Sequence, residues 1–247
     1  MRRHWKLLLG IAVAILVALG AIGYLWLWNL GDPMPEADPA LVSDDQVRVS
    51  RDPWLAFYPD ELPSVGFVFY PGGRVPPEAY APPMRAITEA GYLTVVPSMP
   101  FGLAVLSPDA ADGVIEAHPE IERWVIGGHS LGGAMAAEYV EGHAAMDGLV
   151  LWAAYPADGT DLSAAAIAAT SVYASEDGLT TIDEIEGSRA QLPPDTAFVE
   201  IAGGNHAGFG WYGEQDGDGI ATIPAAEQQQ IVLDNTLKLL EEMQDGG

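Results

Sequence analysis

Ser130 has the sequence context of a nucleophile. It lies in a Gly-x-Ser-x-Gly motif, residues 128–132, between the strand-type run "RWVI" and the helix-type run "AMAAEYV". A serine on such a strand-to-helix turn exposes its hydroxyl, and glycines two positions to either side avoid collisions with the neighbouring strand and helix. The bare motif arises easily by chance in a chain with 28 glycines. The prediction of a nucleophile at Ser130 therefore depends on the strand and helix that flank it.

Two further residues with complementary chemistry follow Ser130 along the chain. Asp177 lies in "YASEDGL" and His206 lies in "GGNHAGFGWYGEQDGDG", and each comes after a strand-type run. A histidine titrates near neutral pH, so it can accept the serine proton and return it to a leaving group. A carboxylate fixes the tautomer of that histidine and stabilises its charged form. The order serine, carboxylate, histidine is therefore consistent with nucleophilic acyl chemistry.

Other carboxylates and histidines compete for these roles. Glu176 and Asp183 lie close to Asp177, and an exposed acidic turn would account for all three. Each of the other histidines has a structural interpretation from its neighbours in the sequence. His4 flanks an apolar run, His118 precedes a proline, His143 ends a helix-type segment, and His129 lies inside the serine motif, where packing or a local hydrogen bond would account for it.

These segments together resemble the α/β-hydrolase family, in particular its small single-domain bacterial members related to dienelactone hydrolases. The resemblance extends over most of residues 65–243, and its most specific parts are "FYPGG", "GGHSLGGAMA", "YASEDGL" and "GGNHAGFGWYGEQDGDG". It implies an α/β-hydrolase fold in which Ser130 is the nucleophile, Asp177 the orienting acid and His206 the general base. The chain has serine where dienelactone hydrolases have a cysteine nucleophile.

Two backbone amides are candidates for stabilising the negative charge that develops on a substrate oxygen. The Leu131 amide stands at the start of the helix behind Ser130. In the loop "YPGGRVPP" the Gly73 amide is the best second donor, with Arg74 next, although a tight turn at Gly72 and Gly73 is the alternative. The Arg74 side chain is also a candidate for binding a substrate carboxylate or for pairing with a local acid.

Four aromatic residues are candidates for an apolar acyl pocket, and core packing is an equal alternative for each of them. All four follow strand-type runs on the side expected to carry Ser130: they are Phe101, Tyr155, Phe209 and Trp211. Relatives often insert a lid between two of the strand regions, and here only the short segment of residues 155–168 lies at that position. This short segment predicts an open site without a cap.

A scaffold of alternating strands and helices must position these residues. Apolar runs rich in β-branched and aromatic residues alternate with helix-type segments, which predicts βαβ units on a mostly parallel central sheet flanked by helices. The strand-type runs are residues 66–70, 92–96, 123–126, 148–152, 171–174 and 197–201. The helix-type segments are residues 81–90, 108–117, 131–142, 182–192 and 225–243. The expected fold is one α/β-hydrolase domain without a large lid.

The N-terminal 28 residues predict a membrane anchor. The run from Leu7 to Trp28 is uncharged and apolar, and as a helix it would span about 33 Å. A cleaved signal peptide usually has a shorter apolar region that ends at a small-x-small site, whereas this run ends in tryptophans, which favour the membrane interface. Three basic residues precede the run and acidic residues follow it. The positive-inside rule therefore predicts a single-pass protein with residues 1–6 in the cytoplasm and the catalytic domain outside it.

Composition limits the partners and cofactors. Residues 29–45 are rich in Pro and Asp and predict a linker to a hydrolase domain at residues 46–247. The net charge is −25, and without the first 30 residues it is −28, so the surface should repel nucleic acid. The absence of cysteine excludes disulfides and thiolate metal sites. "DGDG" at residues 216–219 lacks the regular ligands of an EF-hand and predicts a turn, so neither a metal nor another cofactor is expected.

The sequence therefore predicts a membrane-anchored serine hydrolase that acts on carboxylic esters through an acyl-enzyme at Ser130. Small-molecule or lipid esters are the expected substrates. An acyltransferase or peptidase with the same triad is one alternative, and a noncatalytic binding protein on this fold is the other. No feature of the sequence indicates an oligomeric state.

Overall fold

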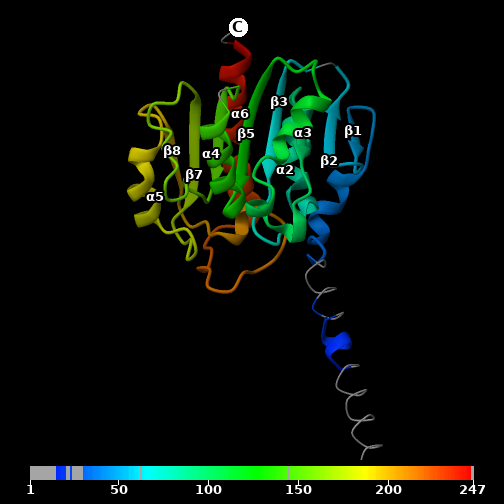
Figure 1. Ribbon diagram of the computed structural model, residues 1–247, viewed down its shortest axis with the longest axis vertical. Helices are drawn as coiled ribbons and strands as arrows, with labels where there is room; N and C mark the ends of the chain where they lie inside the picture. The colour runs from blue at the N-terminus through cyan, green and yellow to red at the C-terminus, as the bar shows by residue number, and fades with distance from the viewer. Residues whose placement is uncertain (1–14, 21–22, 24–29, 62, 144, 246–247) are drawn as a thin grey trace, which may run out of the picture.

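A central eight-stranded sheet organises the molecule (Figure 1). The computed structural model describes residues 15–20, 23, 30–61, 63–143 and 145–245. The strand order is β1-β2-β4-β3-β5-β6-β7-β8, and β3 to β8 run parallel, whereas β1 and β2 are antiparallel at one edge. The strands are β1 (Val47–Ser50), β2 (Leu55–Pro59), β3 (Val65–Tyr70), β4 (Leu93–Val96), β5 (Arg123–His129), β6 (Gly148–Trp152), β7 (Ala168–Ala174) and β8 (Ala197–Ile201). The predicted α/β fold with a mostly parallel sheet is confirmed.

Helices cover both faces of this sheet. The α-helices are α2 (Ala81–Glu89), α3 (Ala110–Ala117), α4 (Leu131–Gly142), α5 (Ile182–Ser188) and α6 (Ala225–Asp245). Helices α2 and α6 pack on one face and α3 and α4 on the other, while α5 lies beside β7. Short 3-10 helices occupy the loops: η1 (Pro35–Leu41), η2 (Pro77–Tyr80), η3 (Pro100–Gly102), η4 (Ala104–Leu106), η5 (Arg189–Gln191) and η6 (Ala207–Phe209). The five predicted helix-type segments correspond to α2 to α6.

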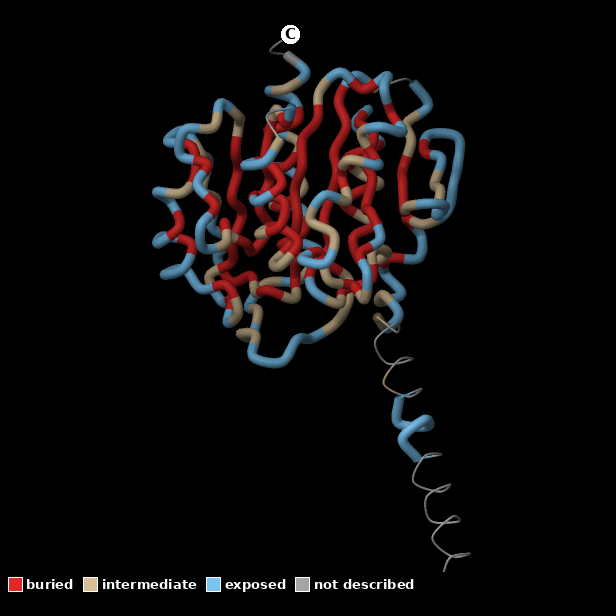
Figure 2. Tube along the Cα trace, viewed as in Figure 1, coloured by how far each residue is buried: buried red, intermediate tan, exposed pale blue. Residues whose placement is uncertain are grey.

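Burial on both faces explains why the central strands are apolar throughout. Along β3, Phe67 and Phe69 point into the core with α2 and α6, whereas Val68 and Tyr70 point into the core with α3 and α4. All six residues of β3 are buried, and Figure 2 shows the same continuous burial along the neighbouring strands. A strand covered on both sides loses the apolar-polar alternation of a half-exposed strand.

The sheet differs from the prediction at three places, one of which is that β7 begins at Ala168 and not at residue 171. Strands β1 and β2 were not predicted, because "VRVS" and "LAFYP" are short and carry an arginine or a proline. Strand β5 continues past the predicted end at residue 126 and includes Gly127 and Gly128, which pair with Phe69 and Tyr70 of β3. Glycine is a poor strand former, but a Cβ at Gly127 would lie 2.7 Å from the carbonyl oxygen of Val150 in β6. Close packing against β6 therefore accounts for Gly127, and close packing against α4 accounts for Gly128.

Part of the predicted linker packs on the domain. Helix η1 buries Ala37 and Ala40, and Asp44 forms an ion pair with Arg85 of α2. The predicted anchor, residues 7–28, lies outside the described residues except for 15–20 and 23. Within the described part of the chain, no helix combines the length and apolar character needed to cross a bilayer.

Residues 155–167, the segment where relatives often insert a lid and where none was expected, contain no helix.

Candidate active site

Ser130 occupies a strained turn between β5 and α4. Its φ of 52° and ψ of −123° are unusual for a residue with a side chain, and its amide donates to the carbonyl of Trp152 at 3.0 Å. A Cβ at Gly128 would lie 2.5 Å from the backbone of Gly132, and a Cβ at Gly132 would lie 2.2 Å from the carbonyl oxygen of Tyr70. Both glycines of the motif are thus required by the close approach of β3, β5 and α4.

Backbone strain gathers at the carboxyl edge of the sheet. Among the described residues, four non-glycine residues have a positive φ: Arg74 (61°), Phe101 (54°), Ser130 (52°) and Ala153 (43°). They follow the carboxyl ends of β3, β4, β5 and β6, respectively, within five residues. Each such conformation costs about 1–3 kcal/mol, and such residues cluster at functional sites. This edge is also where ligands bind in open α/β sheets.

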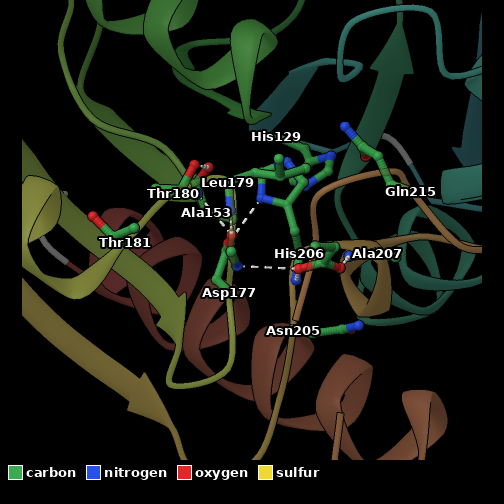
Figure 3. A network of polar contacts seen from close by, with 12 residues as sticks. His129, Ala153, Asp177, Leu179, Thr180, Thr181, Asn205, His206, Ala207 and Gln215 are labelled. Carbon is green, nitrogen blue, oxygen red and sulfur yellow. Dashed lines mark hydrogen bonds and ion pairs between the residues drawn. The ribbon is translucent and has the colours of Figure 1, made fainter. Parts of the chain in front are cut away.

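Asp177 and His206 form the buried half of the candidate site. His206 Nδ1 lies 2.8 Å from Asp177 Oδ2, and both side chains are inaccessible to solvent (Figure 3). Asp177 Oδ1 accepts hydrogen bonds from the amides of Leu179 (2.8 Å) and Thr180 (2.7 Å). Because a carboxylate has no proton to donate, His206 donates from Nδ1 and keeps a lone pair on Nε2. Asp177 therefore holds His206 in the tautomer that a general base requires.

Ser130 and His206 are not joined by a hydrogen bond in this structure. His206 Nε2 is buried and has no hydrogen-bond partner among the described residues. Ser130 is half-buried and lines a pocket, so its side chain faces accessible space. Catalytic hydrogen bonds are often long or misaligned before substrate binds. The lone pair of His206 is thus available for the serine proton once the two side chains are aligned.

A second buried histidine lies beside His206. The ring centroids of His129 and His206 are 4.6 Å apart, and Figure 3 shows the two side chains next to each other. Tyr80 joins His129 to the loop after β3, because its hydroxyl accepts from the Gly72 amide at 3.0 Å and lies 2.8 Å from His129 Nδ1. Burial lowers the pKa of His129 well below its usual value. Burial also raises the pKa of Tyr80, so its hydroxyl stays protonated.

Gly73 and Leu131, the residues whose amides are the predicted oxyanion donors, are close neighbours. Leu131 is the first residue of α4, where an amide has no acceptor within the helix. A Cβ at Gly73 would lie 3.4 Å from Leu131 Cδ2, and Gly72, the residue before Gly73, is held by Tyr80. The structure therefore brings the Gly73 loop against the start of the helix that carries Ser130.

A pocket of about 380 Å³ opens at Ser130. Of the four predicted aromatic residues, only Tyr155 lines it, and its hydroxyl donates to Glu184 at 3.1 Å. Most of the wall consists of small or apolar side chains. The lining residues are Ser130, Leu131, Ala134, Ala153, Ala154, Tyr155, Ala157, Asp158, Leu179 and Thr180.

The other predicted pocket residues lie elsewhere. Phe209 is fully buried and stacks on His129 with ring centroids 5.6 Å apart, so it belongs to the core under the site. Trp211 lines a separate hollow between α2 and α6. Arg74 and Phe101 lie in the loops after β3 and β4 and are not among the residues that line the Ser130 pocket. Sequence position after a strand end did not distinguish a pocket wall from core packing.

Four of the competing residues, Glu176, Asp183, His118 and His143, have other surroundings. Glu176 accepts from the hydroxyl of the adjacent Ser175, and Asp183 lies exposed in the first turn of α5. His118 pairs with Glu120, and His143 stacks on Tyr139 in α4. No group of three or more metal-binding side chains occurs among the described residues.

Two residues of the site had no role assigned from the sequence. Tyr80 lies in η2, and its partner His129 is 49 positions away, so only the folded chain shows the contact. Asp218 belongs to the "DGDG" segment, which was interpreted as a turn, and it accepts hydrogen bonds from the His206 and Ala207 amides. The available signal was the pair of glycines that flank Asp218.

Comparison with known proteins relates the chain to one family. It matches the model of the alpha/beta hydrolase family over residues 66–230. Among solved structures it is similar to a Klebsiella pneumoniae protein assigned as a dienelactone hydrolase, with 16% sequence identity and a TM-score of 0.56. That match covers 76% of this chain and 93% of the other, and at this identity it concerns the fold alone. No curated protein matches the chain in sequence.

Proposed function

The chain belongs to the alpha/beta hydrolase family, and on that premise we propose that it is a serine hydrolase that cleaves carboxylic esters. The family match confirms the resemblance predicted from the sequence. The observation that carries the proposal is the buried Asp177–His206 hydrogen bond, which leaves a lone pair on His206 Nε2, while the His206 ring lies 4.6 Å from the ring of His129, the residue before Ser130. A buried imidazole with a free Nε2 close to the turn that carries a strained serine is suited to general-base catalysis.

Acylation uses these groups in sequence. Ser130 Oγ attacks the ester carbonyl carbon while His206 Nε2 takes the hydroxyl proton, and the carbonyl oxygen becomes an oxyanion. The amides of Leu131 and Gly73 stabilise this negative charge, which is absent from the ground state. His206 then returns the proton to the leaving alcohol as the carbon–oxygen bond breaks. The product of this half-reaction is an acyl-enzyme at Ser130.

Deacylation repeats the steps with water. His206 Nε2 takes a proton from a water molecule, which attacks the acyl carbon and forms a second oxyanion. Collapse of this intermediate releases the carboxylic acid and returns the proton to Ser130 Oγ. Asp177 stabilises the imidazolium in both halves without becoming protonated.

The pocket wall favours an uncharged acyl group. Ala134, Ala153, Ala154 and Ala157 present small apolar surfaces, and Asp158 is the one charged side chain among the lining residues. An anionic acyl group would lie near that carboxylate without a lining cation to pair with it. Neutral small-molecule or lipid esters are therefore the proposed substrates.

We also propose that residues 7–28 anchor the chain in the cell membrane and that the hydrolase domain lies outside the cytoplasm. The support is the sequence itself: an apolar run of bilayer length with basic residues before it and acidic residues after it. Flotation of the full chain with lipid vesicles, and loss of flotation in a chain that begins at Leu30, would test the anchor.

Ester hydrolysis tests the proposed activity. The full chain in detergent is assayed with p-nitrophenyl esters from acetate to long acyl chains, alongside Ser130→Ala, His206→Ala and the control Ser163→Ala, an exposed serine outside the pocket. Turnover should fall at least about 100-fold in the first two variants and stay unchanged in the control. Turnover retained by Ser130→Ala would refute the nucleophile, and turnover of amides or transfer to alcohols in preference to hydrolysis would favour a peptidase or an acyltransferase.

A further inference from the structure

The Asp218 carboxylate connects the two loops that carry Asp177 and His206. Its Oδ1 accepts from the amide of Gly178, the residue after Asp177, at 3.2 Å, and from the amide of His206 at 3.1 Å. Its Oδ2 accepts from the Ala207 amide at 2.8 Å. Oδ1 also accepts from the adjacent Gly219 amide at 2.7 Å. The Asp218 side chain therefore binds backbone amides in the loop that carries Asp177 and in the loop that carries His206.

The backbone around Asp218 fits closely against the Asp177 loop. A Cβ at Gly219 would lie 1.8 Å from the carbonyl oxygen of Glu176, and a Cβ at Gly178 would lie 2.4 Å from the carbonyl oxygen of Gly217. Contacts this short exclude any side chain at either glycine without movement of the backbone. The segment 217–219 is thus built to lie directly on the segment 176–178.

Neighbouring side chains fix the same segment from the other side. Asn205 donates from Nδ2 to the Gly219 carbonyl at 2.9 Å, and its Oδ1 accepts from the Gly208 amide at 3.0 Å. The buried Gln228 of α6 holds the backbone of Asn205 at both its amide (3.0 Å) and its carbonyl (2.7 Å). In Figure 3 Asn205, His206 and Ala207 lie together below the Asp177–His206 contact. The loop that carries His206 is therefore held from α6 as well as from Asp218.

These contacts matter because Asp177 and His206 come from separate loops. Asp177 follows β7 and His206 follows β8, so their 2.8 Å hydrogen bond depends on the relative position of two chain segments. Hydrogen bonds to a charged acceptor are roughly twice as strong as neutral ones, and Asp218 supplies such an acceptor to both segments. A displacement of about 1 Å in a catalytic group can cost about 100-fold in rate.

We propose that Asp218 is a positioning residue of the hydrolase: it sets the His206 imidazole relative to Asp177 and Ser130 by clamping the two loops together. The proposal rests on the proposed function of Ser130 and His206. Asp218 touches neither the substrate pocket nor the reacting atoms, because its contacts are backbone amides. With four amides bound to its two oxygens, the carboxylate is also committed to the protein, in agreement with a turn rather than a cation site at "DGDG".

The consequence differs between two substitutions. Asp218→Asn keeps one carbonyl oxygen and places an amide group against one of the bound N–H groups, so it weakens the clamp. Asp218→Ala removes both acceptors. We expect kcat to fall about 10-fold in the first variant and about 100-fold in the second, with KM within about 2-fold of the wild type, because the pocket is unchanged. The matched control is Asp216→Asn, an exposed aspartate two positions away.

The experiment measures kcat and KM for p-nitrophenyl butyrate with the full chain in detergent, together with the thermal midpoint and the low-field proton resonance of His206 Nδ1–H. We expect loss or broadening of that resonance and loss of kcat in both Asp218 variants at a midpoint near that of the wild type, with the control unchanged. A wild-type kcat together with an unchanged His206 resonance in Asp218→Asn would overturn the proposal. This test with Asp218→Asn holds even if Asp218→Ala fails to fold. If the wild type itself does not turn over esters, the proposed function fails, and the resonance alone still decides whether Asp218 positions His206.

Discussion

Tyr80 is the residue through which the loop bearing Gly73 depends on the buried histidine before Ser130. Its hydroxyl accepts from the Gly72 amide and is hydrogen-bonded to His129 Nδ1, and all three groups are buried. A buried polar group that loses its partner costs about 1–3 kcal/mol, whereas a satisfied network rigidifies its surroundings. The position of the Gly73 amide, a proposed oxyanion donor, should therefore depend on a hydroxyl that never meets the substrate.

Replacement of Tyr80 tests this dependence. Tyr80→Phe should lower the free energy of unfolding by about 1–3 kcal/mol, because the Gly72 amide and His129 Nδ1 both lose a partner. It should also lower kcat for ester hydrolysis, since the Gly73 loop is no longer held. Urea unfolding and steady-state kinetics measure the two effects. Tyr139→Phe, which removes a hydroxyl bound to Asp112 away from the site, is the control and should leave kcat unchanged; an equal loss of kcat in both variants would contradict this dependence.

His129 should make the stability of the protein depend on pH. Burial lowers its pKa in the folded state, whereas in the unfolded chain it titrates at about 6.5. Above that value both states are neutral and the contribution is fully present. As the pH falls below about 6.5, the unfolded state binds a proton that the folded state does not bind. The free energy of unfolding therefore decreases towards acid pH, with a slope that corresponds to at most one proton.

Thermal or urea unfolding between pH 7.5 and about 5 measures this slope. His129→Asn, which keeps an acceptor for Tyr80, should unfold with a shallower dependence on acid than the wild type. His143→Asn, at a partly exposed position directly after α4, serves as the control and should keep the acid dependence of stability that His129 causes in the wild type. An identical slope in wild type and His129→Asn would show that His129 is not the buried neutral group described above.

At this scale the sequence could predict chemistry but not long-range contacts. Ser130, Asp177 and His206 were predicted from motifs and order along the chain, and the structure brings Asp177 and His206 into hydrogen-bond contact. Tyr80 and Asp218 act on residues that the fold brings to them, and nothing in their local sequence indicates which amides they bind. Phe209 and Trp211 were candidates for the pocket because both follow a strand, with core packing as an equal alternative; Phe209 packs on His129, and Trp211 lines a hollow between α2 and α6.

The turn from β5 into α4 is the element that presents Ser130, the proposed nucleophile. Gly132 in the first turn of α4 lies so close to β3 that a methyl group there would be 2.2 Å from the Tyr70 carbonyl oxygen. Gly142 lies at the other end of the same helix, and a methyl group there would have no atom of the surrounding fold within 4 Å. The same substitution at the two ends therefore separates close packing from helix propensity.

Gly132→Ala should destabilise the protein by several kcal/mol and abolish ester hydrolysis, because α4 must move away from β3. Gly142→Ala should be neutral or should stabilise it by up to about 1 kcal/mol, since alanine favours the helix. Unfolding in urea and the rate of hydrolysis provide the comparison. A folded and fully active Gly132→Ala variant would mean that the elbow is looser than the structure indicates.

Element prediction from sequence succeeded for apolar runs with clear ends and failed for two short strands at one side of the sheet. The predicted ranges match β3, β6 and β8 within one residue, although β8 is itself an edge strand in which only Ile201 is buried. The edge strand β1 and its neighbour β2 follow no such pattern, because they are short and carry an arginine or a proline. The continuation of β5 through Gly127 and Gly128 depends on pairing with β3 and β6, which propensity alone does not report.

On the scale of the whole molecule, the chain reaches the domain at the edge that carries Ser130. Leu30 packs against Gly102 of η3, which follows the carboxyl end of β4, and the Met34 amide donates to the Trp211 carbonyl at 2.7 Å. Residues 7–28, the proposed anchor, come shortly before Leu30 in the sequence. An anchored chain would therefore hold its pocket near the bilayer surface.

This arrangement predicts that the anchor raises the rate of hydrolysis of esters dissolved in the bilayer. The full chain reconstituted in vesicles should hydrolyse long-chain esters dissolved in the bilayer at least about 10-fold faster than a chain that begins at Leu30, because both reactants share one surface. The two proteins should hydrolyse p-nitrophenyl acetate in solution at the same rate. Equal rates on the bilayer substrate would contradict the proposed placement of the pocket.

The most direct test of the central claim is to identify the residue that a fluorophosphonate modifies in the full chain. Peptide mass spectrometry after labelling should find a single adduct, on Ser130, formed much more slowly in His206→Ala and absent in Ser130→Ala. An adduct on another residue, or no adduct on the folded wild-type protein, would contradict the role of Ser130 as an activated nucleophile.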